Sequence, residues 1–560
     1  MRLPTISIFG LAWPAVFTAL LLWMSFFPVN LPWLGFIAFV PWLVSMTWQT
    51  GKQRLISSGI LGMVFFGIAL NWMRVADIRM VATWVMLGTW SALFYLILGW
   101  VLGAIYDRHR GLGMTLGFPL VLIPTEWMRA HALEGFPWYF LGHTQHDTLP
   151  LLQLAELGGA FLVSLVVALV NGLIADFYLA CLSRNSGVKW STIGIGFKTA
   201  LVILALACAW IYGTNRLQKT EFIEGTQVAV LQANHPQGLR NFASTEQVRA
   251  DYNQMQRALF GTGNRPLLII WPETSYPALV DITGLDEKHW VADPAGAKGP
   301  SQLLGASTII EPKGLTSKQF NSAVLFDPKG FPVDHYDKMH RVPFGEYVPL
   351  KEWIPFMNVL APYDHDYSIA RGEKLTRFPL PYSPTPLTFG AAICYESGDA
   401  HNFRDLAGGD GKPPVDFFVN QSNDGWFHGT EEHEHHLLLL RFRAVETRRP
   451  VIRAVNMGIS AWIDSYGRVL RPKESKYPKS SAFGVEVPVL EVNSEFLSTS
   501  EWGQYKKNAF VLTGLIPKKG DNLPNIFKLQ GSWPGILAFT CVVLLLLGGT
   551  KKARVIPDLK

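Results

Sequence analysis

The stretch Leu387–Glu396 reads LTFGAAICYE and decides how the polar part of this 560-residue chain folds. Its first seven residues form a short apolar run of the kind found in strands that are buried on both faces. Cys394 follows at the point where that strand must end. The stretch therefore predicts a sheet strand that presents a cysteine at its terminal turn.

Other short runs in the same part of the chain have the same character. They are Gln227–Gln232 (QVAVLQ), Leu267–Trp271 (LLIIW) and Val415–Val419 (VDFFV). Between them, stretches such as 245–260 and 433–447 show helical spacing of apolar and charged residues. Strands that alternate with helices predict an α/β fold in which helices cover a sheet. Residues 215–530 are numerous enough to bury a sizeable core, so we assign them to a separate domain.

The remainder of the chain is strongly apolar. The whole chain is 49% hydrophobic and only 16% charged, whereas soluble proteins are about 25% charged. A helix needs about 20 apolar residues to cross a bilayer. Eight candidate stretches are 7–27, 32–48, 56–73, 81–105, 112–130, 156–179, 194–213 and 533–549. The pattern predicts seven spans in residues 1–214 and one more in residues 531–560.

The basic residues between these stretches favour one orientation in the membrane. Cytoplasmic loops carry an excess of Lys and Arg. Such residues gather on the side of Arg2, at 52–54, 108–110, 184–189 and 551–554, with fewer on the other side. Eight spans then place both termini in the cytoplasm and the α/β domain outside it.

Reactive side chains stand at three turns of the predicted α/β domain. Glu273 lies in Trp271–Ser275 (WPETS), Lys338 lies in Tyr336–Tyr347 (YDKMHRVPFGEY), and Cys394 lies in ICYE. A cysteine nucleophile needs a base or a nearby positive charge. Glu273 can take the thiol proton, and Lys338 can stabilise the thiolate and then the oxyanion. The backbone N–H of Tyr395 can be a second donor.

Cysteine usage sets Cys394 apart. The other three, Cys181, Cys208 and Cys541, fall in apolar stretches, where cysteine behaves as a small hydrophobe. No disulfide framework can be built within the polar domain. Taken alone, Cys394 is also compatible with an inert buried thiol, so its interpretation depends on Glu273 and Lys338.

The motifs occur in a specific order. They are WPE (271–273), YDKMHRVPFGEYVP (336–349), ICYE (393–396), NQSNDGWF (420–427) and RFRAVETRRPVIRAVNMGIS (441–460). This set resembles the nitrilase superfamily of carbon–nitrogen hydrolases. Joined to a multi-span first half with Gly135–Trp138 (GFPW), Leu141, Gly142 and Gln145, it resembles the apolipoprotein N-acyltransferase family of the Gram-negative inner membrane. The resemblance covers nearly the whole chain.

The resemblance implies a fold and a set of roles. It implies an α-β-β-α sandwich over residues of about 220–495. It implies Glu273 as general base, Lys338 as oxyanion stabiliser and Cys394 as nucleophile. The supporting residues that it implies are Glu346, Tyr395 and Glu396.

The implied reaction proceeds by a ping-pong scheme through a thioester on Cys394. A membrane phospholipid donates a fatty acyl chain, and the acceptor is the α-amine of the diacylglyceryl-cysteine of an apolipoprotein. We expect a monomeric multi-pass protein of the inner membrane with a periplasmic catalytic domain, and neither metal nor cofactor. Nucleic-acid binding has little support, because the net charge of +6 includes no long basic run.

An apolar, Pro-rich loop at 350–363 suggests a lipid entrance. It contains Trp353, Phe356 and Met357. One hypothesis is that these side chains dip toward the bilayer and guard the site. The alternative is that they simply pack on the domain.

Two charged clusters leave alternatives open. The histidines between His428 and His436, with their interleaved glutamates, suit either a zinc site or the solvated start of a helix, and we favour the helix. Arg441, Arg443, Arg448 and Arg449 suit either a phosphate headgroup or salt bridges with Glu446, and we favour the salt bridges.

Two other functions remain to be weighed. A membrane-tethered nitrilase-like amidase would use the same three residues, with water as the final acceptor. A single span is enough to anchor a protein, so seven spans before the domain favour lipid handling. A transporter is disfavoured because the spans are poor in ionisable residues, and Glu126, Arg129 and Asp176 lie near span ends.

Overall fold

The chain divides into two compact units in the computed structural model. The residues described are 8–184, 192–236, 245–282, 299–311, 317–349, 351, 353, 357, 368–380, 383–474, 480–482, 485–521 and 533–547. A helical unit comprises Met1–Asn71, Trp84–Arg216 and Ser532–Lys560. A sheet unit comprises Leu217–Gly531 together with Trp72–Thr83.

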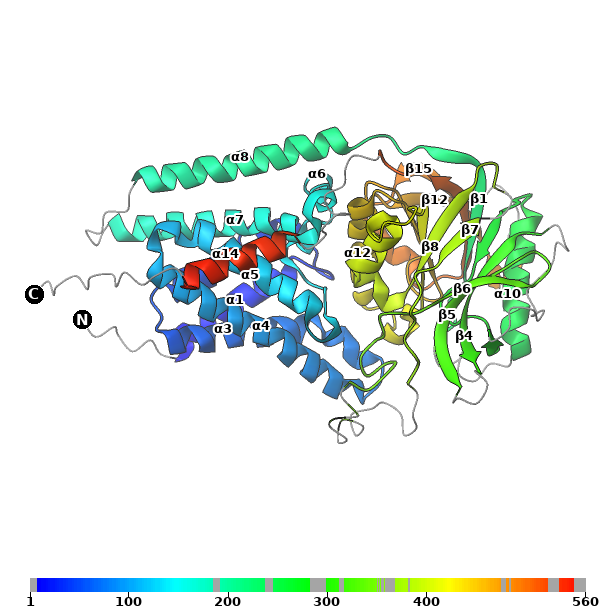
Figure 1. Ribbon diagram of the computed structural model, residues 1–560, viewed down its shortest axis with the longest axis horizontal. Helices are drawn as coiled ribbons and strands as arrows, with labels where there is room; N and C mark the ends of the chain where they lie inside the picture. Colours follow the sequence, from blue (N-terminus) through cyan, green and yellow to red (C-terminus); the bar gives the residue numbers. More distant parts are fainter. Residues whose placement is uncertain are drawn as a thin grey trace, which may run out of the picture. The chain divides into compact units, whose positions relative to one another are not determined.

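A helix occurs in each of the eight apolar ranges (Figure 1). The helices are α1 (Ile8–Met24), α2 (Val40–Met46), α3 (Gly51–Ala69), α4 (Met80–Arg108), α5 (Gly113–His131), α7 (Ala155–Arg184), α8 (Thr192–Arg216) and α14 (Trp533–Leu547). Within the described residues, three helices are long and apolar enough to cross a bilayer, at Met80–Arg108, Ala155–Leu182 and Gly194–Arg216. Shorter apolar helices occupy Gly10–Met24, Pro32–Met46 and Trp533–Leu547.

Two charged side chains inside the helical unit, Asp176 and Arg129, have polar partners. The Asp176 carboxylate accepts from the backbone N–H groups of Met114 and Thr115 and lies 2.9 Å from the Lys198 ammonium. Arg129 donates to the carbonyls of Phe136 and Trp138, so it ties the GFPW motif to the end of α5. Because Asp176 and Arg129 both have polar partners, these two residues serve as structural ties.

Two large sheets and one two-stranded sheet form the described part of the sheet unit. The strands are β1 (Phe222–Gln232), β2 (Leu268–Ile270), β3 (Val280–Asp281), β4 (Ser301–Ile310), β5 (Lys318–Phe326), β6 (Pro332–Asp337), β7 (Arg377–Leu380), β8 (Leu387–Ile393), β9 (Phe417–Ser422), β10 (Val451–Val455), β11 (Ala461–Ile463), β12 (Leu470–Glu474), β13 (Ser480–Ala482), β14 (Val485–Val487), β15 (Val489–Phe496) and β16 (Phe510–Pro517). The first sheet has the order β12-β15-β16-β1-β2-β4-β5-β6, with β3 beside β4. The second has the order β11-β10-β9-β8-β7, and β13 pairs with β14.

The core lies between the two sheets. Side chains such as Val230 and Ile270 from the first sheet form one buried cluster with Phe389 and Phe417 from the second. On the outer face of the first sheet, α10 (Thr245–Gly261) buries Tyr252 among residues such as Leu231. Helices α11 (Ala400–Arg404) and α12 (Glu432–Thr447) belong to the other side, and Figure 1 shows α10 and α12 on opposite sides of the strands. The nitrilase-like α-β-β-α arrangement is therefore confirmed.

The structure extends the sandwich beyond the range that the resemblance implied. Strand β16 begins at Phe510, after the expected limit near 495, and yet pairs antiparallel with β1 in the middle of the first sheet. Val228 in β1 lies opposite Gly514 in β16. A strand that completes a sheet from a distant part of the chain has no local signal that distinguishes it from a linker.

Residues Trp72–Thr83 were not expected in the sheet unit. They follow α3 and include the first turn of α4. The Trp72 ring packs edge-on against Phe427 at a centroid distance of 4.8 Å. This short segment therefore contributes to the sheet unit although it lies between two helices of the other unit in sequence.

Candidate active site

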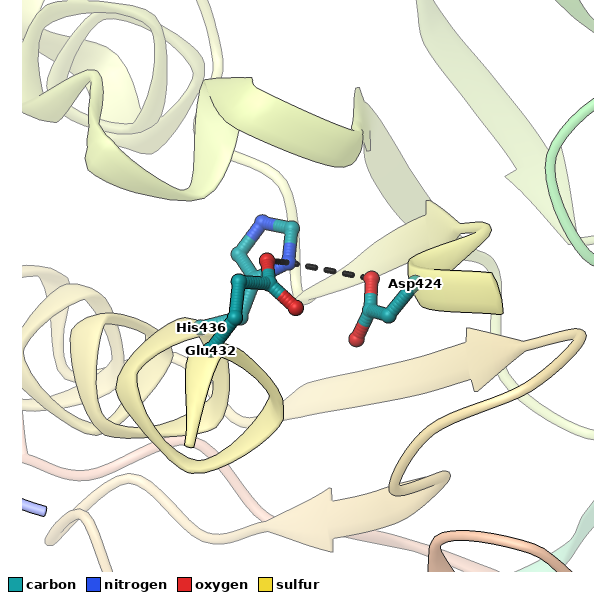
Figure 2. A group of neighbouring side chains, drawn as sticks. All are labelled: Asp424, Glu432 and His436. Atoms are coloured by element: carbon teal, nitrogen blue, oxygen red, sulfur yellow. Dashed lines mark hydrogen bonds and ion pairs between the residues drawn. The ribbon is translucent and has the colours of Figure 1, made fainter. Parts of the chain in front are cut away.

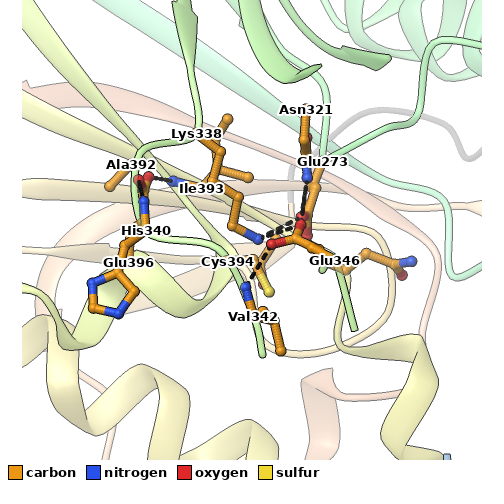
Figure 3. A network of polar contacts seen from close by, with 12 residues as sticks. Glu273, Asn321, Lys338, His340, Val342, Glu346, Ala392, Ile393, Cys394 and Glu396 are labelled. Atoms are coloured by element: carbon orange, nitrogen blue, oxygen red, sulfur yellow. Dashed lines mark hydrogen bonds and ion pairs between the residues drawn. The ribbon is translucent and has the colours of Figure 1, made fainter. Parts of the chain in front are cut away.

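The structure brings Glu273, Lys338 and Cys394 to one cavity of about 470 Å³. Each residue stands just beyond a strand: Glu273 after β2, Lys338 after β6, and Cys394 after β8. The first two strands belong to one sheet and the third to the other. The ends of the two facing sheets therefore converge on the site, and Figure 3 shows the sulfur beside the ammonium group and the carboxylates.

Glu273 is held by donors from three directions. Its Oε1 accepts from the Asn321 amide at 2.8 Å and from the Lys338 ammonium at 3.4 Å. Its Oε2 accepts from the backbone N–H of Asn423 at 3.0 Å. The side chain is buried yet lines the cavity, so its orientation is fixed where a general base is needed.

Lys338 is an ammonium ion held between two carboxylates. Its side chain is buried and lies 2.8 Å from Glu346 and 3.4 Å from Glu273. Burial lowers the pKa of Lys338, but Glu346, Cys394 and Glu273 together raise it above its ordinary value. A permanent positive charge at this place can stabilise an oxyanion.

Glu346 fixes the position of that ammonium group. While Oε1 pairs with Lys338, Oε2 accepts from the backbone N–H of Val342 at 2.8 Å. Asn321 also donates to Glu346, at 3.2 Å, and thereby bridges the two glutamates. The supporting role expected for Glu346 is a positioning role in this geometry.

The backbone of Cys394 is in the left-handed region, with φ of 52°. Such a conformation costs a non-glycine residue on the order of 1–3 kcal/mol and marks functional turns. Burial and the neighbouring Glu273 raise the pKa of the Cys394 thiol well above its ordinary value, although Lys338 opposes them. The raised pKa favours the neutral thiol at rest, so a nucleophilic role for Cys394 would require a base.

Glu396 joins the cysteine turn to the lysine loop from behind the cavity. Its Oε2 accepts from the Ile393 N–H at 2.7 Å, and its Oε1 accepts from the backbone N–H groups of Met339 and His340 at 2.8 and 3.0 Å. The Tyr336 hydroxyl donates to the same Oε1 at 2.7 Å. Glu396 is fully buried, so these bonds fix the cysteine turn and the lysine loop relative to each other.

Tyr395 directly follows the cysteine and contacts the lysine loop. Its ring packs edge-on against the His340 ring, with centroids 5.2 Å apart. The use of its backbone N–H as an oxyanion donor stays a prediction.

Two asparagines complete the site and were missed by sequence reasoning. Asn321 lies in β5 and has no motif around it that could have identified it. Asn423 belongs to the quoted NQSNDGWF motif, which was used for the resemblance but not for a role. Both donate to Glu273, so they are orienting residues for the base.

The proposed gating residues differ in how much of each side chain is exposed to solvent. Trp353 is 84% exposed, whereas Met357 is 9% exposed. Phe356 lies outside the described residues. Packing on the domain describes Met357 better, and a gating role remains a hypothesis for Trp353.

His428 is exposed, but the other three histidines of the cluster are buried, so the expected solvated helix start is wrong for them. His433, His435 and His436 lie on α12 with exposed fractions of 0%, 3% and 1%. Figure 2 shows Glu432 and His436 pointing from this helix toward Asp424. Their potential ligand atoms lie within 4.8 Å of one another. However, the Arg453 guanidinium is already 2.6 Å from Asp424, so the group forms a network of ion pairs.

The arginine cluster makes internal contacts. Arg443 lies 2.7 Å from Glu446, which agrees with the expected salt bridge. Arg441 and Arg449 donate to the backbone carbonyls of Gly467 and Val415. These contacts favour a structural role over a phosphate site.

Comparisons with known proteins agree with this geometry. The family profile described as carbon-nitrogen hydrolase matches residues 227–477, and the apolipoprotein N-acyltransferase N-terminal domain matches residues 18–173. An apolipoprotein N-acyltransferase of Geobacter metallireducens is 29% identical over 470 residues, which cover 81% of this chain and 85% of the relative. One from Vibrio cholerae is 27% identical, covering 81% of this chain and 87% of its own length. Together the two matched regions cover most of this chain, and the chain belongs to the apolipoprotein N-acyltransferase family within the carbon–nitrogen hydrolase superfamily.

Proposed function

We propose that this enzyme moves a fatty acyl chain from a membrane phospholipid to the α-amine of the N-terminal diacylglyceryl-cysteine of apolipoproteins. The observation that carries the proposal is the single cavity that Glu273, Lys338 and Cys394 share. The names of the relatives supply the class of acceptor. Glu273, Lys338 and Cys394 are proposed as base, oxyanion stabiliser and nucleophile.

The first half-reaction forms a thioester. Glu273 takes the proton of the Cys394 thiol while the sulfur attacks the ester carbonyl of the phospholipid. A C–S bond forms, and the carbonyl oxygen becomes an oxyanion near the Lys338 ammonium. The C–O bond then breaks, and Glu273 returns the proton to the departing lysophospholipid oxygen.

The second half-reaction releases the acyl chain to the acceptor. The neutral α-amine attacks the thioester carbonyl and forms a C–N bond. Glu273 takes a proton from the amine and gives it to the sulfur as the C–S bond breaks. The thiol is regenerated, and the two half-reactions together consume no water and need no cofactor.

The cavity walls favour an acyl donor over a small amide. Apolar side chains line it, including Phe320, Ile369, Trp426 and Phe427. Exposing a lipid chain to water costs about 0.8 kcal/mol for each CH₂. An apolar wall beside the nucleophile offsets that cost, and this favours the acyltransferase over the alternative, a membrane-tethered amidase.

The membrane arrangement is part of the proposal. Eight spans in segments 1–214 and 531–560 would hold the protein in the bacterial inner membrane, with both termini cytoplasmic. Residues 215–530 would lie in the periplasm, where the enzyme acts as a monomer. The three long apolar helices and the loop charges support this arrangement.

Trp353 is proposed as a contact to the lipid surface near the entrance. Its 84% exposure supports such a contact, because an indole ring is favoured at the bilayer interface. Trp353→Ser should slow turnover of phospholipid in vesicles and leave turnover of detergent-dispersed short-chain donor unchanged. Equal rates in vesicles for the variant and the wild type would contradict the contact.

Intact-mass analysis tests the proposed reaction directly. The purified full-length protein is incubated with acyl-labelled phospholipid, and the peptide that contains Cys394 is weighed. We expect one fatty acyl mass on that peptide, removable by hydroxylamine and lost when a diacylglyceryl lipopeptide is added. Cys394→Ser is the control. Hydrolysis of small amides without any acylation of the lipopeptide would overturn the proposal in favour of the amidase.

A further inference from the structure

His436 touches the main chain of Cys394 itself. The imidazole Nε2 lies 2.9 Å from the Cys394 carbonyl oxygen, and the ring is almost fully buried. A carbonyl oxygen can only accept a hydrogen bond, so Nε2 must carry a proton in this contact. The histidine thus holds the peptide group that follows the nucleophile.

The other ring nitrogen faces two carboxylates. Nδ1 lies 3.1 Å from Asp424 and 3.2 Å from Glu432, as Figure 2 shows for the three side chains. Hydrogen bonds to these oxygens require a proton on Nδ1 as well. Burial and Arg453 lower the pKa of His436, but Asp424 and Glu432 raise it more, to about 9. The ring is therefore an imidazolium ion that donates on both sides.

The contact matters because the cysteine turn is strained. Cys394 sits at φ of 52°, and its sulfur direction depends on how the flanking peptide groups are oriented. Glu396 accepts from the Ile393 N–H and so holds the Ala392–Ile393 peptide group, one residue before the cysteine. His436 holds the peptide group after it. Glu396 and His436 thus hold the chain on both sides of the turn.

The same network also reaches the proposed base. Asp424 follows Asn423, whose backbone N–H donates to Glu273. Asp424 is fixed in turn by Arg453 at 2.6 Å and by the Ser422 hydroxyl at 2.7 Å. One buried turn, Ser422–Asp424, therefore sets the position of Glu273 directly and that of Cys394 through His436.

We propose that His436 is a positioning residue that aims the Cys394 sulfur, and that Asp424 and Glu432 serve the site by keeping both ring nitrogens of His436 in use as donors. The proposal rests on the proposed role of Cys394 as nucleophile. The buried face of α12 thereby supports the acyl-transfer site, although His436 itself does not line the cavity.

Substitutions at position 436 can test the hydrogen bond to the Cys394 carbonyl. His436→Gln keeps an N–H donor for the Cys394 carbonyl, whereas His436→Leu removes it. Thr447→Val is the matched control, because Thr447 is equally buried on α12 and its hydroxyl donates to the Arg443 carbonyl within the same helix. All variants are studied as the full-length protein in detergent.

Two reaction rates are measured for each variant, and thermal unfolding shows whether the variant is folded. The first is the rate at which iodoacetamide alkylates Cys394, which needs no lipid substrate. The second is the rate of thioester formation from phospholipid. Displacement of a reacting atom by about 1 Å can cost about 100-fold in rate. We expect His436→Leu to slow both reactions by roughly 10- to 100-fold in folded protein, while His436→Gln and Thr447→Val keep most of the rate.

The outcomes decide the proposal in either direction. Wild-type alkylation in folded His436→Leu would overturn it, as would an equal loss in Thr447→Val, which would mean that any lost buried hydrogen bond on α12 has the same effect. If His436→Leu does not fold, the glutamine variant decides: a large loss in folded His436→Gln overturns the donor role. Absence of thioester in the wild type with the alkylation pattern intact would instead reject the phospholipid reaction.

Discussion

The Lys338 ammonium lies 2.8 Å from Glu346 and 3.4 Å from Glu273. The lysine therefore has its closer ion pair with the glutamate that is not the proposed base. Glu273 remains available to accept a proton, and two amide N–H donors orient it. Glu346 is therefore the carboxylate expected to hold Lys338 in place, and Glu273 is the one expected to accept the proton.

Replacing Glu346 with Gln should slow thioester formation by about 10- to 100-fold, because a misplaced charge near the reacting atoms costs rate on that scale. Lys338 would lose its closer partner and pair more tightly with Glu273. Single-turnover measurement with labelled phospholipid checks this. Asp334→Asn removes a carboxylate from Lys374 on the surface and should leave the rate unchanged. A wild-type rate in Glu346→Gln would contradict the positioning role.

Replacing Cys394 with Gly should give a more stable protein than replacing it with Ala. The left-handed backbone at this position costs a residue with a β-carbon roughly 1 kcal/mol or more, and glycine avoids that cost. Both variants lack the thiol, so their free energies of unfolding differ mainly by the cost of the left-handed backbone at this position. Thermal unfolding followed by tryptophan fluorescence makes the comparison. A higher unfolding temperature for the alanine variant would show that the turn is not strained.

Glu396→Gln should destabilise the sheet unit by about 2–3 kcal/mol, since an amide cannot accept on both sides as the carboxylate does. Its Oε1 accepts from Met339, His340 and Tyr336, and its Oε2 accepts from Ile393. Denaturant unfolding measures the loss. Glu495→Gln, which alters an exposed pair with Lys473, should change stability little. Similar stabilities for the two variants would refute the locking role.

The stabilising contribution of His436 should depend on pH. Its pKa is raised from 6.5 to about 9 by Asp424 and Glu432, against the opposing effects of burial and Arg453. A raised pKa contributes stability that is fully present below the unfolded value and is lost as pH rises through the folded value. The difference in unfolding temperature between wild type and His436→Gln should therefore shrink between about pH 6.5 and pH 9. A difference that stays constant over this range would contradict the imidazolium assignment.

Ala76→Phe should discriminate between long and short acyl donors. Ala76 lines the cavity from the Trp72–Thr83 segment of the sheet unit, and a ring there would fill part of it. Turnover of long-chain phospholipid should fall, while alkylation of Cys394 by iodoacetamide should not change. Equal effects on long-chain and short-chain donors would mean that this wall does not contact the acyl chain.

Short motifs in the sequence were enough to predict the fold class of the sheet unit and three side chains that share one cavity. Glu273, Lys338 and Cys394 each follow a buried strand, and the residue types themselves specify a base, a cation and a nucleophile. The apolar helices were equally visible, because length and hydropathy are local properties of a segment. The apolar run before Cys394 identified β8 for the same reason.

Only the tertiary structure decided the contacts between distant segments. Asn321 became an orienting residue because β5 runs beside β6, and β16 entered the first sheet beside β1. His436 was expected at a solvated helix start, and yet it is buried against the Cys394 carbonyl. The sequence alone determined which residues have reactive groups and which segments avoid water, because those are properties of side chains and of local order. Folding determined which of those groups meet, because a contact between residues far apart in the chain depends on how the sheets and helices pack.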